Sequence, residues 1–245
     1  MTESTIRIGV VLPEVLGTYG DGGNAVVLQK RLEWRGISSE VVSIGLGQPV
    51  PSDLDIYLLG GGEDAAQGLA TENLRANPGL QQAAGRGATV LAICAGMQIL
   101  GEWYTDASGN HVAGLGVLDA RTFPQGKRST GELVSTPLVP GLTDLLTGFE
   151  NHGGATELGP DARPLGRVLH GDGNAVGDPL SDGAVQGGIF GTYMHGPALA
   201  RNPQFADFLI MRASGLDSLQ PLDLPTVDKL RGERLDAAGI SIGAE

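Results

Sequence analysis

The chain has a single cysteine, no long hydrophobic run and no basic leader segment. One Cys cannot form an internal disulfide, which is typical of proteins from reducing compartments. No apolar stretch reaches the roughly 18 residues that a membrane-spanning helix needs. The apolar run 6–12 begins almost at once, without the basic region that opens a signal peptide. We therefore expect a cytoplasmic protein with no direct membrane insertion.

Basic residues are scarce relative to acidic ones. The chain has 16 Lys and Arg against 28 Asp and Glu, which gives a formal net charge of −12. A chain with this charge repels phosphate backbones and anionic lipid, so nucleic acid and membrane surfaces are disfavoured as partners. The simplest interpretation of the charge is solubility.

Regularly recurring apolar runs are what the chain does contain. Gly is frequent, at 40 residues, but apolar runs recur between the glycines, which indicates tight loops and not disorder. Strand-like runs alternate with helical periodicity, a pattern typical of an α/β protein with a doubly wound, mostly parallel sheet. Strands are predicted over 6–12, 41–44, 54–59 and 89–93, and helices over 25–36, 69–84 with a break at 77–79, and 95–103.

After about residue 110 the pattern changes. Short β-like runs separated by Gly and Pro predict an antiparallel extension of the same sheet. A further apolar run, 184–193, is followed by a helix at 205–211 and a weak helix at 226–237. The few apolar positions of that last helix suggest an appendage, with partner binding as one role for it. We divide the chain into a domain over 1–213 and a C-terminal helical tail over 214–245. The β-like runs are 117–123, 131–138 and 167–170.

The single cysteine follows the last strand of the first half. The segment Ala92-Ile93-Cys94-Ala95-Gly96 reads as strand, sharp turn and helix, the pattern of a nucleophile elbow. Its small residues let the strand and helix backbones approach closely. A sulfur at the start of a helix is favoured as thiolate by the helix dipole. We predict that Cys94 is a nucleophile; the alternative is a buried structural cysteine.

Attack by Cys94 on a carboxamide would create an oxyanion, which needs N–H donors already in place. The Ala95 amide at the helix start is one candidate. The turn Gly60-Gly61-Gly62 ends a strand expected beside that of Cys94, and the Gly62 amide is the second candidate. A Gly triplet alone also fits an ordinary tight turn, so it carries weight only beside Cys94.

A thiol nucleophile also needs a base. Of the four histidines, His195 follows the apolar run 184–193, and the end of a strand is where catalytic loops gather in an α/β sheet. Cys and His that are distant in sequence but meet in space are usual in thiol hydrolases. His111 and His170 lie in polar, Gly-rich turns, where we expect them to be exposed.

Together these motifs resemble the class I glutamine amidotransferases. The segments 60–62, 92–98 and 193–196 are similar to the glutaminase domain of cobyric acid synthases, and so is 150–154. The resemblance covers roughly residues 6–212 and implies a flavodoxin-like class I amidotransferase fold that hydrolyses glutamine. The residues it implicates are Cys94 and His195 in catalysis, Gly62 and Ala95 in the oxyanion hole, and Gln98 in substrate binding.

Within this branch the chain is similar to the GatD type of glutaminase subunit, which serves lipid II isoglutaminyl synthases. The similarity implies a heterodimer with a Mur-ligase-like partner, MurT, which uses ATP and Mg²⁺ to amidate the α-carboxyl of D-glutamate in the peptidoglycan stem. It implies neither a cofactor nor a metal in this chain. An arginine important for glutamine binding in that branch falls at Arg128. Without the resemblance, Arg128 beside Lys127 would be interpreted as a solvated loop cation.

One position departs from the family pattern. Class I enzymes usually carry a Glu two residues after the histidine, and here that position is Pro197, with Asp207 as the next acid. Either a Cys–His pair suffices or an acid comes from elsewhere, and we expect the partner chain to supply it. The departure is similar to that of the GatD branch.

Three other functions stay open at this point. The chain could be a non-catalytic docking subunit, since the usual Glu is missing, although Cys94 and His195 are both present. It could also be the glutaminase part of a cobyric acid synthase-like enzyme, or another hydrolase with this fold, such as a γ-glutamyl hydrolase.

Overall fold

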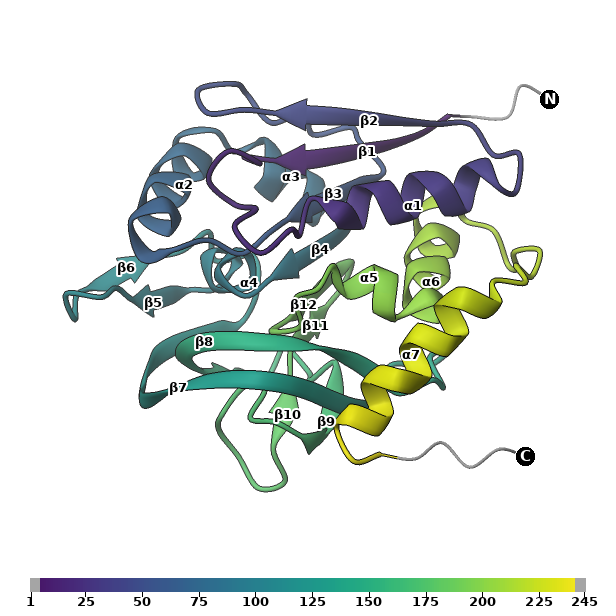
Figure 1. The fold of residues 1–245 in the computed structure, drawn as a ribbon. Coiled ribbons are helices and arrows are strands. Elements are labelled where there is room, and N and C mark those ends of the chain that lie inside the picture. The colour runs from purple at the N-terminus through teal and green to yellow at the C-terminus, as the bar shows by residue number, and fades with distance from the viewer. Residues whose placement is uncertain (1–4, 241–245) are drawn as a thin grey trace.

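The computed structural model of the chain describes residues 5–240, which form two β-sheets with helices around them (Figure 1). The first sheet has the strand order β11-β12-β4-β3-β1-β2. All neighbouring pairs in it are parallel except β11 with β12. Its strands are β1 (Ile6–Val11), β2 (Ser39–Ile44), β3 (Ile56–Leu59), β4 (Thr89–Ile93), β11 (Ala184–Gln186) and β12 (Ile189–Thr192).

The central strands of this sheet are apolar throughout because both of their faces are covered. Every residue of β3, β4 and β12 is buried, as expected for parallel strands between helical layers. Helix α1 packs with α5 and α6, while α2 packs with α4. The predicted fold class is confirmed. The helices are α1 (Gly23–Glu33), α2 (Asp64–Ala76), α3 (Gly79–Gly85), α4 (Ala95–Leu100), α5 (Ala198–Arg201), α6 (Pro203–Ser214) and α7 (Pro225–Ala237).

The second sheet is mainly antiparallel and is dominated by the long pair β7–β8 (Figure 1). The expectation that these strands extend the first sheet is wrong, because they hydrogen-bond among themselves. The two runs predicted at 117–123 and 131–138 belong to one strand, β7. The strands are β5 (Trp103–Thr105), β6 (His111–Ala113), β7 (Ala120–Pro137), β8 (Leu146–Leu158), β9 (Gly166–His170) and β10 (Ser181–Asp182).

Helix α4 is shorter than predicted. It ends at Leu100, and Trp103 begins β5 instead of closing the helix. Gly101 is extended at this point and lies so close to β7 that a Cβ on it would come within 2.7 Å of the Ala120 carbonyl oxygen. The chain therefore leaves the helix directly into the second sheet.

Helix α7 packs onto the second sheet, near the end of β7 (Figure 1). Its Leu235 is fully buried against Val134, with Ala238 beside them. The division of the chain at residue 213 stays a prediction, and 1–4 and 241–245 lie outside the described residues. No helix between residues 5 and 240 is long and apolar enough to cross a bilayer.

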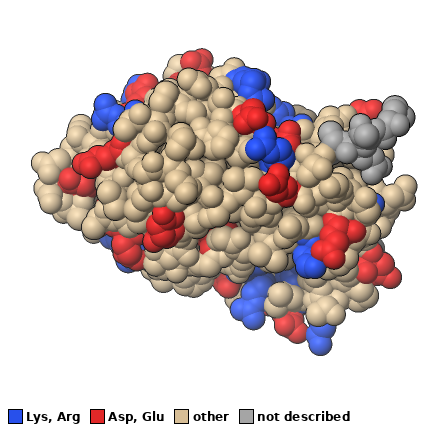
Figure 2. All heavy atoms as spheres, turned by 90° about the horizontal axis from the view of Figure 1, so that it is seen from above, with Lys and Arg blue, Asp and Glu red and all other residues tan. Residues whose placement is uncertain are grey.

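The charged side chains on the face shown in Figure 2 are scattered singly or in small groups of both signs. They form no continuous basic patch on this face. Such a surface agrees with the interpretation of the negative charge as a solubility feature.

Candidate active site

Cys94 occupies a strained turn between β4 and α4. Its φ of 50° and ψ of −110° lie outside the regions that L-residues favour. Its amide donates to the Thr192 carbonyl on the neighbouring β12 at 2.9 Å, which fixes the turn against the sheet. The geometry is that of the nucleophile elbow predicted from the sequence.

The small residue after the elbow is required by close packing. A Cβ on Gly96 would come within 2.9 Å of the Gly60 carbonyl oxygen and of the Leu59 Cβ. The start of α4 therefore passes directly over the end of β3. This contact holds Cys94 beside the glycine turn that follows β3.

The thiol of Cys94 is buried, with 7% of the residue exposed. Burial raises the pKa of Cys94 from 9.0 to about 12, while the Ala95 N–H and the positive charge of Arg128 act to lower it. The helix start thus favours the thiolate as expected, but desolvation outweighs it. In the free protein the thiol keeps its proton at neutral pH, so a base must remove it.

His195 is fixed by both sheets. It follows β12, and its backbone forms two hydrogen bonds with Phe149 of β8, at 2.8 and 3.1 Å. In the residues just before His195, the Thr192 hydroxyl and the Tyr193 amide donate to the Asp182 carboxylate, at 2.5 and 3.1 Å. These contacts determine where the strand ends and therefore where the imidazole points.

The acid that orients His195 is Asp21. Its carboxylate lies 3.0 and 3.2 Å from Nδ1 of His195, and its side chain is fully buried. The same carboxylate accepts from the Gly61 amide at 2.8 Å. Asp21 comes from the Gly-rich loop between β1 and α1, at the carboxyl edge of the sheet. The bond to Nδ1 stabilises the tautomer in which Nε2 is free to accept a proton.

The structure thus places an acid of this chain on His195, where the sequence offers none nearby; supply of a further acid by the partner chain stays a prediction. The position after His195 is indeed Pro197, but the acid comes from the opposite end of the sequence. Asp207, the next acid along the chain, bonds to Arg31 and Arg35 and joins α6 to α1. It has a structural role at that interface.

The side chains of Cys94, His195 and Asp21 lie close together around Gly61. A Cβ at this position would lie 2.6 Å from His195 Cε1, 3.4 Å from Asp21 Oδ2 and 3.5 Å from the Cys94 Cβ. The Nε2 atom of His195 is buried and has no partner among the described residues. A nucleophile, a base with a free nitrogen and an orienting acid thus surround one glycine.

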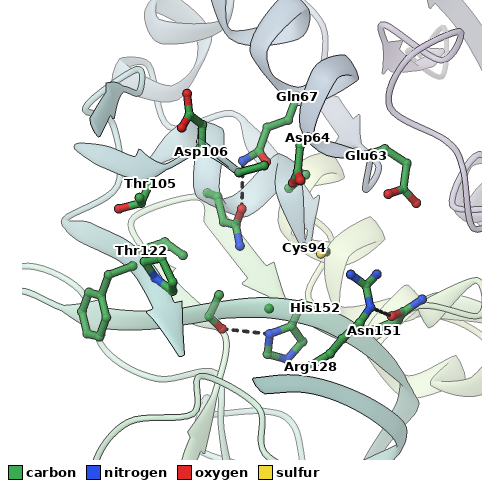
Figure 3. A pocket seen from close by; sticks show the side chains of 18 of the residues that line it. Glu63, Asp64, Gln67, Cys94, Thr105, Asp106, Thr122, Arg128, Asn151 and His152 are labelled. Atoms are coloured by element: carbon green, nitrogen blue, oxygen red, sulfur yellow. Dashed lines mark hydrogen bonds between the residues drawn. The ribbon is translucent and has the colours of Figure 1, made fainter. Parts of the chain in front are cut away.

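A pocket of about 310 Å³ opens beside Cys94 (Figure 3). Arg128 of β7 lines it and donates from Nε to the Asn151 side chain at 2.6 Å. Within residues 5–240, no group accepts from the two terminal nitrogens of Arg128. The Arg128 guanidinium is therefore oriented by Asn151 but forms no ion pair with a described residue, whereas Lys127 pairs with Asp172. Other charged side chains on the pocket wall are Glu63, Asp64 and Asp106.

Two residues with candidate amides for an oxyanion, Gly62 and Ala95, line the pocket together with Cys94. The Ala95 N–H faces the sulfur of Cys94, and Gly62 lines the pocket beside it. Because Gly61 donates to Asp21, its amide is occupied, and the Gly62 amide remains. This arrangement agrees with the predicted pair, which stays a prediction until a ligand is bound.

Gln98 lines the pocket but its amide is held by the protein. Its Oε1 accepts from Gln67 at 2.8 Å, and its Nε2 donates to the Tyr193 hydroxyl at 3.0 Å. These bonds link α2, α4 and the strand that carries His195. Substrate contact by Gln98 stays a prediction, and its observed bonds are those of a residue that positions others.

Four residues at the site were not identified from the sequence. Asp21 and Tyr19 belong to the loop after β1, and the Tyr19 ring packs against His195 with centroids 4.7 Å apart. Asn151 and His152 lie on β8, in the segment 150–154. The signal for Asp21 was its position after a parallel strand, at the edge where Cys94 and His195 also lie. His111 and His170 are exposed, as predicted.

The described residues contain no group of three or more His, Cys, Asp or Glu side chains arranged to hold a metal ion. The polar groups of the pocket instead suit a small polar organic ligand, since they combine a cation, several carboxylates and amide donors.

Comparisons with known proteins agree with this geometry. The CobB/CobQ-like glutamine amidotransferase domain matches residues 7–203. A lipid II isoglutaminyl synthase (glutamine-hydrolyzing) subunit GatD from Streptococcus pneumoniae is 32% identical over 233 residues, which cover 94% of this chain and 88% of that protein. The subunit GatD from Staphylococcus aureus is 37% identical over 204 residues, 82% of each chain. A crystal structure of a glutamine amidotransferase shares the fold, with a TM-score of 0.54 at 18% identity, over 85% of this chain and 98% of that one.

Proposed function

Since the chain belongs to the CobB/CobQ-like glutamine amidotransferase family, we propose that it is the glutaminase subunit of a lipid II isoglutaminyl synthase. It hydrolyses glutamine to glutamate and ammonia. A Mur-ligase-like subunit of the MurT type uses this ammonia, with ATP and Mg²⁺, to amidate the α-carboxyl of D-glutamate in the peptidoglycan stem. The proposal is supported by similarity to two subunits of that name over most of their lengths.

The observation that carries the hydrolytic part is the meeting of three groups around Gly61. Cys94 stands on an elbow, His195 has a buried Nε2 without a partner, and Asp21 holds the opposite nitrogen of the ring. A structural cysteine needs none of these. The pocket at Cys94 also carries the aimed cation Arg128, which suits an α-carboxylate.

In the first half of the reaction, Nε2 of His195 takes the proton from the Cys94 thiol. The sulfur attacks the γ-carboxamide carbon of glutamine, and the C=O π electrons move to oxygen. The Ala95 and Gly62 amides stabilise that oxyanion. As the tetrahedral species collapses, the C–N bond breaks, and the proton on Nε2 passes to the departing nitrogen to give ammonia. A γ-glutamyl thioester on Cys94 remains.

In the second half, a water molecule replaces the ammonia. His195 removes a proton from this water, which attacks the thioester carbon in the same oxyanion hole. Collapse breaks the C–S bond, the sulfur recovers the proton from His195, and glutamate leaves. Asp21 holds the Nδ1 side of the ring in both halves and stabilises the imidazolium each time it forms.

Glutamine is held by its charged end. The terminal nitrogens of Arg128 can donate two parallel hydrogen bonds to the α-carboxylate. Asn151 fixes the direction of the guanidinium by accepting from Nε. The carboxamide then extends from this anchor toward Cys94, on the same pocket wall as Ala95.

This subunit is proposed to need no cofactor, since acyl transfer through a cysteine uses only side chains and backbone amides. ATP and Mg²⁺ belong to the ligase subunit in this scheme. The cytoplasmic location expected from the single cysteine is part of the same proposal.

The experiment compares the purified chain, the chain mixed with a Mur-ligase-like subunit, and the Cys94→Ala form of that mixture. We expect glutamate release by the chain alone and glutamine-dependent amidation of a D-glutamate stem by the mixture. Cys94→Ala should abolish both but leave amidation from added ammonia intact. A mixture that amidates equally well with the Cys94→Ala chain would leave a docking subunit as the function.

A further inference from the structure

Arg128 lies in a stretch of β7 whose pairing with β8 is interrupted. The register skips the residues between Pro124 and Ser129, and Arg128 is one of them. An irregularity of this kind leaves residues unpaired and can redirect a side chain, so other contacts must fix the one that is redirected. The bond from Nε to Asn151 holds the end of the Arg128 side chain, whereas its backbone depends on its neighbours in the chain.

Both chain neighbours of Arg128 bond to the same carboxylate, that of Asp172. The Lys127 Nζ lies 2.9 and 2.8 Å from its two oxygens, and the Ser129 hydroxyl donates to Oδ2 at 2.6 Å. Ser129 is 2% exposed, while the Lys127 side chain is largely exposed. The bond to Ser129 is therefore the stronger constraint, because an exposed ion pair contributes little.

These bonds decide on which face of β7 the Arg128 side chain lies. In an extended strand successive side chains point to opposite faces, so residues 127 and 129 share a face and residue 128 takes the other. Lys127 and Ser129 are held on the side of Asp172. Arg128 is consequently directed to the opposite side, and of the three it alone lines the pocket at Cys94 (Figure 3).

Asp172 is itself anchored to the second sheet. It lies in the turn after β9, between Gly171 and Gly173, whose φ angles are 95° and 57°. The amides of Asp172 and Gly173 donate to the two carboxyl oxygens of Glu150, at 2.8 and 2.9 Å. Glu150 is 3% exposed and belongs to β8, so the turn is fixed to that strand from inside the protein.

The charge of Asp172 suits this role. The two groups that its oxygens meet, the Lys127 amine and the Ser129 hydroxyl, both donate to it. Their hydrogen bonds lower the pKa of Asp172 from its ordinary value of 3.8, which favours the carboxylate. Asp172 does not line the pocket, so its effect on a ligand is exerted through the residues that it holds.

We propose that Asp172 is a positioning residue for substrate binding: by holding the residues on both sides of Arg128, it presents the guanidinium to the α-carboxylate of the substrate. Asp172 itself contacts neither the substrate nor the reacting atoms. This inference rests on the proposed glutaminase function, because the carboxylate in question is that of glutamine.

The orientation of Arg128 is tested by NMR of the arginine Nε–H groups, which needs no substrate. Arg128→Ala assigns the signal, whose hydrogen is bonded to Asn151 in the unaltered chain. Asp172→Ala should make its exchange with water about fivefold faster, the factor for losing one ordinary hydrogen bond. An unchanged exchange rate would overturn the proposal.

Two further variants control this measurement. Glu102→Ala removes a carboxylate that pairs with Arg121 of the same strand at 2.6 Å, and it should leave the Arg128 signal unchanged. Ser129→Ala removes only the buried bond to Asp172 and should also speed the exchange. It provides the test if thermal denaturation shows that Asp172→Ala is unfolded, and an unchanged rate in a folded Ser129→Ala chain would then refute the proposal.

The effect on the substrate is tested with glutamine and with 4-aminobutanamide, which lacks the α-carboxylate. Asp172→Ala should raise KM for glutamine roughly twofold to tenfold, the cost of ordering one side chain on binding, and leave kcat unchanged. Hydrolysis of 4-aminobutanamide should not change, and Glu102→Ala should affect neither substrate. A loss of the same size for both substrates would mean a general structural role and would contradict the inference.

A double-mutant cycle shows whether Asp172 acts through Arg128. In the Arg128→Ala chain, Asp172→Ala should cause no further rise in KM for glutamine, because the side chain that it positions is gone. A rise of the same size in both backgrounds would show that Asp172 acts independently of Arg128, and the proposal would be wrong.

These measurements also separate the inference from the proposed function. If the unaltered chain hydrolysed neither amide, the glutaminase proposal would fail, while the NMR result would still decide whether Asp172 orients Arg128. If glutamine were hydrolysed and Asp172→Ala changed neither KM nor the Arg128 signal, the function would stand and the inference would fall.

Discussion

Replacing Asp21 by Asn tests the member of the site that no local sequence pattern indicates. The change keeps the size of the side chain but removes its charge. The carboxylate now accepts from His195 Nδ1 and from the Gly61 amide. An Asn side chain has one acceptor oxygen. If that oxygen serves Gly61, the NH₂ group faces Nδ1 and favours the tautomer with the proton on Nε2.

The magnitude follows from these contacts. Losing a hydrogen bond to a charged group costs about 1.5–3 kcal/mol, and about 1.4 kcal/mol is a factor of ten in rate. That sets a lower bound of roughly a tenfold to hundredfold loss. A fixed wrong tautomer removes the base altogether and extends the loss to about 10⁴. We expect kcat for glutamine hydrolysis to fall by roughly 10² to 10⁴.

The assay is glutamate release by the isolated chain, with Asp217→Asn, an exposed acid, as the isosteric control. Thermal denaturation shows whether the variant is folded. A kcat within about threefold of the unaltered chain would mean that Cys94 and His195 suffice without an acid. If the ligase subunit restored the activity of the Asp21→Asn chain, the partner would be the source of the orienting acid.

Three further changes have outcomes that follow from the structure. Arg128→Ala should raise KM for glutamine by roughly tenfold to a hundredfold with little change in kcat, as for a lost charged hydrogen bond; unchanged kinetics would make Arg128 a surface residue. The rate of Cys94 labelling by iodoacetamide should keep rising with pH above neutrality without a plateau, and a plateau near pH 7 would contradict the raised pKa. The free energy of unfolding in denaturant should fall between pH 9 and about 12, because the thiol ionises at lower pH in the unfolded chain than in the folded one. Gly96→Ala should cost about 1–3 kcal/mol of stability through overpacking, whereas Gly68→Ala, in open space within α2, should not destabilise; equal stability of the two variants would contradict the close contact.

The nucleophile region could be predicted because its signals are local. Strand β4 has the bounds 89–93 in both the sequence interpretation and the structure. The residues of the elbow that follows are specified by close approach of α4 to β3, and small residues at such a position are visible in the sequence. The break between α2 and α3 at Asn77-Pro78 is likewise predicted by the local Pro and Gly residues.

The second sheet could not be predicted as separate because its strands carry ambiguous patterns. Strand β7 contains the polar stretch Gln125 to Ser129, where its pairing with β8 is interrupted. In the sequence, that polar stretch separates β7 into two short β-like runs. Strand β8 includes Gly153-Gly154 and buried polar residues, so it does not show apolar alternation. Only the pairing between strands distant in sequence settles which sheet they join.

The acid was missed for a related reason. Asp21 and His195 are 174 positions apart, and nothing near His195 indicates a partner. Their meeting depends on β1 and β12 ending at the same edge of the sheet, which is a property of the topology. The usual family position of the acid, at Pro197, pointed to its absence. Another loop at the same edge carries it instead.

The most direct test of the central claim is the mass of the Cys94 peptide during turnover. The chain is mixed with glutamine, quenched in acid within the first turnovers, digested and analysed by mass spectrometry. If Cys94 attacks the carboxamide, this peptide gains the mass of one γ-glutamyl group, sensitive to hydroxylamine as a thioester is, and the Cys94→Ser chain shows no such thioester. Glutamate released at the normal rate with no thioester on Cys94, or continued release by Cys94→Ala, would contradict the account.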